Sequence, residues 1–113
     1  MNIQIYGKNK CFDTKKAERY FKERKIKFQY IDLLRYGLSE KEYTSVKRAV
    51  GGTMKLIDEQ SKAYQDLYIV NQPNEAAVEQ KLLEYWELFK TPIVRNGKQA
   101  TVGYQPEIWK GWE

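Results

Sequence analysis

The stretch IQIYGKNKCFDTKKAERYF, residues 3–21, predicts a strand, a loop and a helix in direct succession. Ile3 and Ile5 alternate along a short segment that stops at Gly7, which is the period of a strand. After a polar loop, apolar residues recur at the spacing of one helix face, namely Ala17, Tyr20 and Phe21. Such a unit places the end of the loop at the N-terminus of a helix.

The loop contains Cys11, the only cysteine of the chain. Unpaired N–H groups at a helix N-terminus favour a thiolate over a thiol. The neighbouring charges are mostly positive, from Lys8, Lys10, Lys15 and Lys16, with Asp13 opposing them. We therefore expect the pKa of Cys11 to lie below its usual ~8.5, which makes it a candidate nucleophile. The alternative is a small buried hydrophobic residue, but the polar neighbours favour a reactive thiol.

Thr14 stands three residues after Cys11, where a dithiol protein has its second cysteine. Its hydroxyl is expected to donate a hydrogen bond to the sulfur, or only to cap the helix. Since the chain has no second thiol, any covalent intermediate on Cys11 must be resolved by an external thiol.

Composition narrows the class of protein. A chain of 113 residues is about one domain, and 42% hydrophobic residues exclude a disordered polymer. A single cysteine allows no internal disulfide, and no apolar run reaches ~18 residues, so we expect a cytoplasmic protein that does not span a membrane. The absence of histidine excludes imidazole catalysis and removes the usual zinc ligands, so no metal site is expected. The net charge of +5 is spread along the chain, which argues against direct nucleic-acid binding.

Downstream of the first helix, a second strand is predicted to end near Asp32, because apolar residues alternate at Ile26, Phe28 and Tyr30. Strand, helix and strand within about 30 residues form a βαβ unit, whose two strands are parallel and whose crossover is right-handed.

Helix signals dominate the next part of the chain. A helix start is predicted by the capping-box pair Ser39 and Glu42 and by the hydrophobic staple Leu38 and Tyr43. That helix should end at Gly51-Gly52. Short helices or turns are expected up to Pro73, and Asn74 is placed to cap a further helix that ends near Leu88.

The last quarter predicts a hairpin and a terminal helix. Asn96-Gly97 is a strong hairpin signal, so strands at Ile93-Val94 and at about Ala100 to Val102 should be antiparallel. Pro106 suits the first turn of a helix that could close over the sheet through Ile108 and Trp109.

The assembled order is βαβ, a helical insertion at about 38–90, and ββα, within one domain over residues 1–113. This predicts an α/β protein with a mixed sheet and the outline of a thioredoxin-like fold. Pro92 lies directly before the third strand, where this fold class commonly has a cis-proline beside the reactive cysteine. Local sequence leaves the cis and trans alternatives open.

Several segments together resemble the arsenate reductase and Spx family of small thioredoxin-like proteins. The most specific are the cysteine followed four residues later by Lys-Lys-Ala, the run TPIV before a Gly-Lys turn, and VGY before the last helix. The resemblance covers nearly the whole chain. It implies the thioredoxin-like fold, a cis Pro92 and a catalytic-type Cys11.

The resemblance also implies where an oxyanion would be held. Arsenate reductases of this family use three arginines, and the corresponding positions here are Gln60, Thr91 and Tyr104. Neutral hydrogen bonds replace permanent charge at all three, so we expect weak arsenate reduction or none. Replacement charge is expected from Arg95 and from the lysines near the cysteine, Lys8, Lys10 and Lys15, whereas Lys98 is expected to be a solvated surface residue.

Two functions follow from the resemblance. The first is an arsenate reductase-like thiol oxidoreductase without a bound cofactor, whose Cys11 is resolved by glutathione or another small thiol, with a thiol-bearing protein or a glutaredoxin as further partner. The second is an Spx-like regulator that binds a partner such as the RNA polymerase alpha subunit without catalysis. Its docking surface would include Lys15, Lys16, Gly51 and Gly52.

Overall fold

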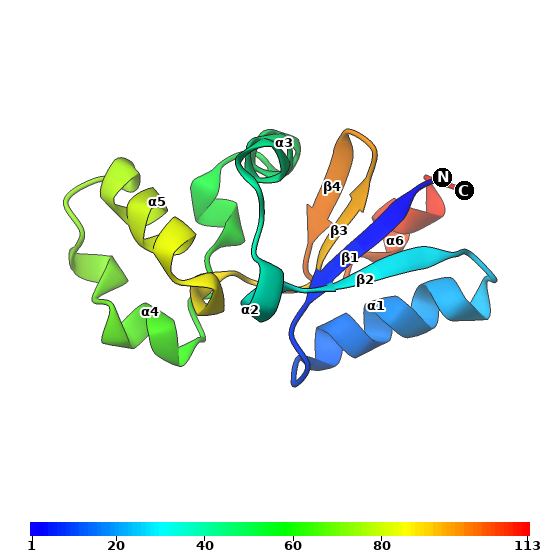
Figure 1. Cartoon of the computed structure of the whole chain (residues 1–113), viewed down its shortest axis with the longest axis horizontal. Helices are drawn as coiled ribbons and strands as arrows, with labels where there is room; N and C mark the ends of the chain where they lie inside the picture. The colour runs from blue at the N-terminus through cyan, green and yellow to red at the C-terminus, as the bar shows by residue number, and fades with distance from the viewer.

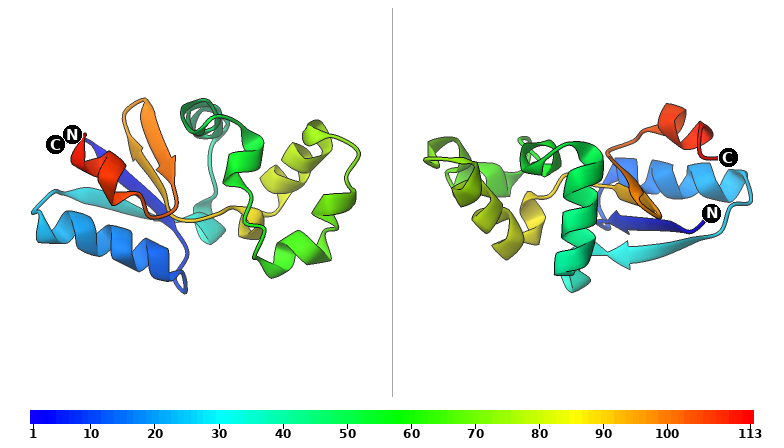
Figure 2. Two further views of the ribbon diagram at one scale, coloured as in Figure 1. Left: turned by 180° about the vertical axis from the view of Figure 1, so that it is seen from behind. Right: turned by 90° about the horizontal axis from the view of Figure 1, so that it is seen from above.

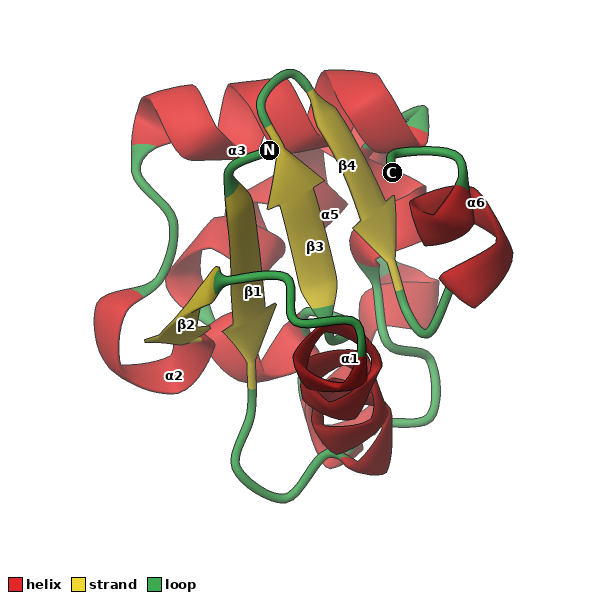
Figure 3. Cartoon of the chain, turned by 90° about the vertical axis from the view of Figure 1, so that its right-hand side faces the viewer, coloured by secondary structure: helices red, strands yellow, loops and turns green.

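The computed structural model describes residues 1–113 and is built on one four-stranded mixed sheet. The strands are β1 (Ile3–Gly7), β2 (Phe28–Asp32), β3 (Ile93–Asn96) and β4 (Gln99–Val102). Their order in the sheet is β2-β1-β3-β4, as seen in Figure 3. β1 pairs parallel to β2 and antiparallel to β3, and β3 pairs antiparallel to β4. The predicted βαβ unit and hairpin are thereby confirmed.

Helices α1 (Phe12–Glu23) and α6 (Pro106–Lys110) lie against one face of the sheet (Figures 1 and 3). The core on this face consists of seven buried residues: Ile3, Ile5, Ala17, Tyr20, Phe21, Val94 and Trp109. The Trp109 ring is fully buried, and its Nε1 donates to Thr101 Oγ1 at 2.8 Å. Ile108 was predicted to cover the sheet as well, but it is 48% exposed, because so short a helix turns only one face to the sheet.

The segment between β2 and β3 contains no strand of the sheet and packs on the opposite face. Its helices are α2 (Leu33–Tyr36), α3 (Glu40–Val50), α4 (Lys62–Asp66) and α5 (Glu75–Glu84), with 3₁₀ turns η1 (Thr53–Leu56), η2 (Ile69–Asn71) and η3 (Trp86–Leu88). Figure 2 shows α3 standing between the sheet and the rest of this helical segment. A core of thirteen buried residues joins it to the sheet through Tyr6 and Ile93.

The ends of these helices follow the predicted caps. Ser39 and Glu42 form the capping box of α3, and Gly51 ends that helix in the left-handed region at φ 97°. Asn74 accepts from Ala77 N at 2.9 Å and begins α5. α5 ends at Glu84, earlier than predicted, because the chain tightens there into η3. The four-residue α2 was not predicted, since it is too short to show a helical period.

The long axis of the molecule measures 44 Å, with the helical segment at one end and the sheet at the other. The loop after β1 reaches the boundary between the two parts, where the chain also enters β3. No helix combines the length and the apolar character needed to cross a membrane.

Candidate active site: a thiol at a helix N-terminus

Cys11 is the N-cap residue of the twelve-residue helix α1. Its extended backbone, with φ −87° and ψ 116°, lets the first N–H groups of the helix point toward the residue. Cys11 Sγ lies 3.6 Å from the carbonyl oxygen of Thr91, to which the neutral thiol donates. The following Thr91-Pro92 peptide bond is cis, as the resemblance implied. Cys11 is partly exposed, so a reactant in solution can reach the sulfur.

The environment of Cys11 favours the thiolate. Burial raises the pKa of Cys11. Hydrogen bonds from the Thr14 and Thr91 side chains and from the backbone N–H groups of Thr14 and Asp13 lower it by more than burial raises it, so the pKa lies below the ordinary value. The carbonyl of Thr91 favours the protonated thiol, whereas its hydroxyl favours the thiolate. The sequence predicted a lowered pKa from the helix N-terminus and from nearby lysines; the causes found are hydrogen bonds, including two from N–H groups of that helix, and none is a lysine.

Thr14 is held directly beside the sulfur. Thr14 is 1% exposed, and its hydroxyl forms no hydrogen bond with any other group of the protein. A hydrogen bond from this hydroxyl to the sulfur is stronger when Cys11 is a thiolate, which lowers the pKa of Cys11. Gly7 makes room for this arrangement, because a Cβ at that position would meet Thr14 Cγ2 at 2.2 Å.

A cavity of about 590 Å³ opens beside Cys11. Its lining residues come from the loop after β1, the end of β2, α2, the turn after η1 and the chain before β3: Lys8, Asn9, Lys10, Cys11, Asp32, Leu34, Asp58 and Thr91. Sequence reasoning missed Asp32, Leu34 and Asp58. Asp32 could have been found from topology, because it ends a strand parallel to β1 and pairs with Gly7. Asp58 could not, since it reaches the site through the fold of the helical segment.

Lys8 lines this cavity, but its ammonium is hydrogen-bonded to two backbone carbonyl oxygens. Its Nζ donates to the carbonyl oxygens of Glu87 at 2.8 Å and Phe89 at 2.7 Å, which ties the loop to the 3₁₀ turn η3. Burial lowers the pKa of Lys8, although Asp58, the Cys11 thiolate and Glu87 oppose that shift. Lys10 lines the cavity as an exposed side chain, whereas Lys15 is exposed on α1 and does not line it.

Of the predicted oxyanion-binding residues, the structure brings only Thr91 to Cys11. Gln60 lines a separate depression around Asp58 and Lys90. Tyr104 packs edge-on against Trp109, with ring centroids 5.6 Å apart, in a groove between α1 and α6. Neither residue lines the Cys11 cavity.

Arg95 was expected to supply charge to the cysteine; in the structure its guanidinium is bound elsewhere, and it does not line the Cys11 cavity. Arg95 Nη1 donates to Gln4 at 3.1 Å and to the Tyr6 hydroxyl at 3.2 Å, and lies 3.8 Å from Glu42 Oε2. It shares the face of β3 that turns toward α3. The geometric reason is the strand period of two, which puts Arg95 on the same face as Ile93.

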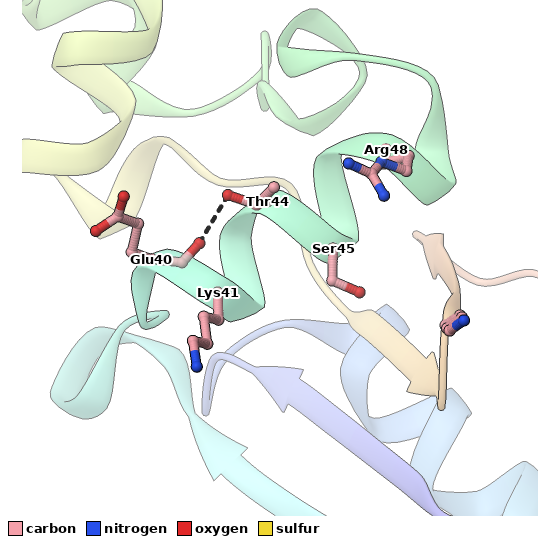
Figure 4. Close-up of a pocket in the computed structure, with 6 residues that line it drawn as sticks. Glu40, Lys41, Thr44, Ser45 and Arg48 are labelled. Carbon is pink, nitrogen blue, oxygen red and sulfur yellow. Dashed lines mark hydrogen bonds between the residues drawn. The ribbon is translucent and has the colours of Figure 1, made fainter.

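Lys98 also lies away from Cys11. It lines a groove of about 600 Å³ along the exposed face of α3, together with Glu40, Lys41, Thr44, Ser45 and Arg48 (Figure 4). Within this groove the Thr44 hydroxyl donates to the carbonyl oxygen of Glu40 at 2.9 Å. The hairpin lysine therefore belongs to a second polar surface of the molecule.

Comparisons with known proteins agree with this architecture. A model of the ArsC family matches residues 6–111. The global transcriptional regulator Spx 2 of Oceanobacillus iheyensis is 33% identical over 112 residues, covering 95% of this chain and 80% of that protein.

Solved structures show the same fold. An ArsC family related protein from Bacteroides fragilis superposes with a TM-score of 0.86 at 19% identity, covering 100% of this chain and 98% of that one. Arsenate reductase from Vibrio cholerae gives 0.82 at 23% identity, covering 96% and 94%. The glutaredoxin-like NrdH-redoxin from Escherichia coli gives 0.52 at 16% identity, covering 100% and 96%. The fold is thioredoxin-like, and the chain belongs to the ArsC family.

Proposed function

We propose that the chain is a monothiol oxidoreductase that exchanges disulfides through Cys11. The observation that carries the proposal is the position of the sulfur. It lies at the N-terminus of α1, beside Thr91, with hydrogen-bond donors that lower the pKa of the thiol. A thiolate is the nucleophile in thiol–disulfide exchange, so these donors increase the reactive fraction at neutral pH.

The proposed cycle has two steps. The Cys11 thiolate attacks one sulfur of a substrate disulfide, the S–S bond breaks, a mixed disulfide forms on Cys11, and the other half leaves as a thiolate. The thiolate of an external thiol such as glutathione then attacks the mixed disulfide on the substrate sulfur and releases the Cys11 thiolate. The substrate disulfide is thus exchanged for a disulfide that contains the external thiol. Such a cycle suits a reducing compartment such as the cytoplasm. A glutaredoxin is a suitable partner for reducing the disulfide that contains glutathione.

Arsenate is proposed to be a poor substrate. No arginine lines the Cys11 cavity, and Gln60 and Tyr104 lie in other depressions. A polyanion there would meet two carboxylates without the planar charged donors that bind oxyanions well.

The test is formation of the mixed disulfide. We expect the wild-type chain to gain one glutathione on incubation with glutathione disulfide, as measured by intact mass, and to lose it on addition of reduced glutathione. The Cys11→Ser variant should gain none while keeping the same circular dichroism spectrum. A wild-type chain that forms no adduct with glutathione disulfide or with a small synthetic disulfide would show the proposal to be wrong.

A second candidate is supported by the Spx 2 relative, which is a transcriptional regulator. In this reading the chain binds a protein partner, for which the resemblance implies the RNA polymerase alpha subunit, and Cys11 is at most a sensor. A binding assay with the purified alpha subunit separates the two candidates. Binding that is equal for wild type and Cys11→Ser, together with no mixed disulfide, favours the regulator.

A further inference from the structure

Two carboxylates line the cavity that contains the Cys11 sulfur. Asp32 Oδ1 accepts from Leu34 N at 3.2 Å, and Asp58 Oδ1 accepts from Gln60 N at 3.0 Å. Each of these bonds uses one carboxylate oxygen. Neither Asp32 nor Asp58 forms an ion pair with a basic side chain. Both residues line the cavity, and both carboxylates therefore keep acceptor capacity for a ligand.

The positive charges that line the cavity do not outnumber its negative charges when Cys11 is a thiolate. Two of the three protons on Lys8 Nζ are directed to backbone carbonyl oxygens, so one is left for a ligand, while its positive charge remains and interacts with Asp58. Lys10 is exposed at the rim. With Cys11 ionised, the titratable lining carries two positive and three negative charges. A negatively charged disulfide meets net repulsion here, and a positively charged one meets attraction.

Apolar surface lies next to the sulfur as well. Leu34 lines the cavity and is 47% exposed, and Phe12, directly after Cys11, is 79% exposed. Leu34 offers contact to a short methylene chain inside the cavity, and Phe12 lies outside the cavity lining. A ligand with a sulfur, a few methylenes and a cationic end matches the thiolate, the apolar surface and the carboxylates in turn.

We infer that the preferred disulfide substrate carries an ammonium or guanidinium group within a few bonds of its sulfur. This inference rests on the proposed function, because it assigns a substrate class to the same thiol. In the reaction, the Cys11 thiolate attacks the sulfur of an aminothiol disulfide. One aminothiol stays on Cys11 as a mixed disulfide, and the other leaves as its thiolate. The ammonium of the bound half lies near Asp32 and Asp58.

The experiment is a charge series of small disulfides of similar length. Cystamine is doubly positive, 2-hydroxyethyl disulfide is neutral, and 3,3′-dithiodipropionate is doubly negative. The rate of adduct formation on Cys11 is measured by intact mass at low ionic strength. Each rate is divided by the rate of the same disulfide with 2-mercaptoethanol thiolate, which removes differences between leaving groups. We expect cystamine to exceed the neutral disulfide by at least about threefold, and the anionic disulfide to be slowest.

Variants of Asp32 and Asp58 test whether these carboxylates cause the preference for a cationic disulfide. In Asp32→Asn and Asp58→Asn the backbone hydrogen bonds persist, because an asparagine oxygen accepts them equally. Each should reduce the cystamine-to-neutral ratio by roughly two- to fivefold, and the double variant should abolish the preference. Within one variant the ratio is independent of the thiolate fraction, so a changed pKa of Cys11 does not affect it. Asp66→Asn, on the exposed end of α4 outside the cavity, is the matched control and should keep the wild-type ratio.

The outcomes separate this inference from the function on which it rests. Adducts that form with all three disulfides at equal normalised rates, or a ratio unchanged in the double variant, overturn the substrate class and leave the oxidoreductase standing. No adduct with any of the three overturns both. A peptide disulfide with lysine beside the cysteine, compared with its glutamine counterpart, identifies the source of the cation. Where cystamine is preferred among the small disulfides, a matching preference in the peptides assigns the cation to protein substrates, and its absence there assigns it to free aminothiols.

Discussion

Replacing Thr14 with valine tests the central argument about the thiol. Valine keeps the shape of threonine but has no hydroxyl, so the packing beside Gly7 persists while the donor to the sulfur is lost. A hydrogen bond to a charged group contributes ~1.5–3 kcal/mol, and about 1–2 kcal/mol is the appropriate range here because Cys11 is partly exposed. The thiolate-to-thiol ratio at neutral pH should therefore fall by roughly tenfold.

The same substitution should change stability with a sign that depends on pH. The folded pKa of Cys11 lies below the unfolded value near 8.5, so the thiolate contributes stability above that value and loses it as pH falls through the folded pKa. At high pH, Thr14→Val removes the charged hydrogen bond and destabilises by about 1–2 kcal/mol. At low pH the hydroxyl is buried without a partner, so its removal is neutral or stabilising by up to about 1 kcal/mol.

The assay combines alkylation of Cys11 by iodoacetamide across pH with urea unfolding at pH 6 and pH 9. Thr101→Val is the matched control, because its buried hydroxyl already accepts from Trp109 Nε1 and lies outside the Cys11 cavity. That variant should be destabilised at both pH values and should leave the alkylation profile unchanged. An unchanged profile in Thr14→Val, or equal destabilisation at both pH values, would refute the reasoning.

Two further predictions concern the charged networks. The pKa of Glu79 is lowered to about 2 by hydrogen bonds from Lys47, Tyr43 and Thr53, so its contribution to stability is present above pH about 4.5 and is lost as pH falls toward 2. Urea unfolding at pH 6 and pH 2.5 should show that Glu79→Gln removes about 1–2 kcal/mol at the higher pH and little at the lower, and equal losses would contradict this account. Arg95→Gln leaves Glu42 without its cation and should lower the free energy of unfolding by about 1–3 kcal/mol, with no change in the rate of Cys11 alkylation. A slower alkylation of Cys11 in this variant would show that the charge of Arg95 does act on the thiol.

Much of the fold was predictable because local signals agreed with one another. The capping box at Ser39, the left-handed end at Gly51 and the cap at Asn74 each depend on a few neighbouring residues, and the structure confirms all three. The Asn96-Gly97 turn is likewise a local signal, and β3 and β4 pair across it as predicted. The errors fall where tertiary packing decides, at α2 and at the exposed side of α6.

The sequence by itself determined that a single cysteine would stand at the start of a helix after a strand, since that requires only hydrophobic period and a polar loop. It also determined that no second thiol could resolve an intermediate. Only the tertiary structure decided what surrounds the sulfur. Thr91, Asp32 and Asp58 reach Cys11 across 80, 21 and 47 positions of the chain, and their approach depends on strand pairing and on the path of the helical segment. The position of Arg95 away from the Cys11 cavity was also decided by the tertiary structure, because the face on which a strand residue lies is a property of the assembled sheet.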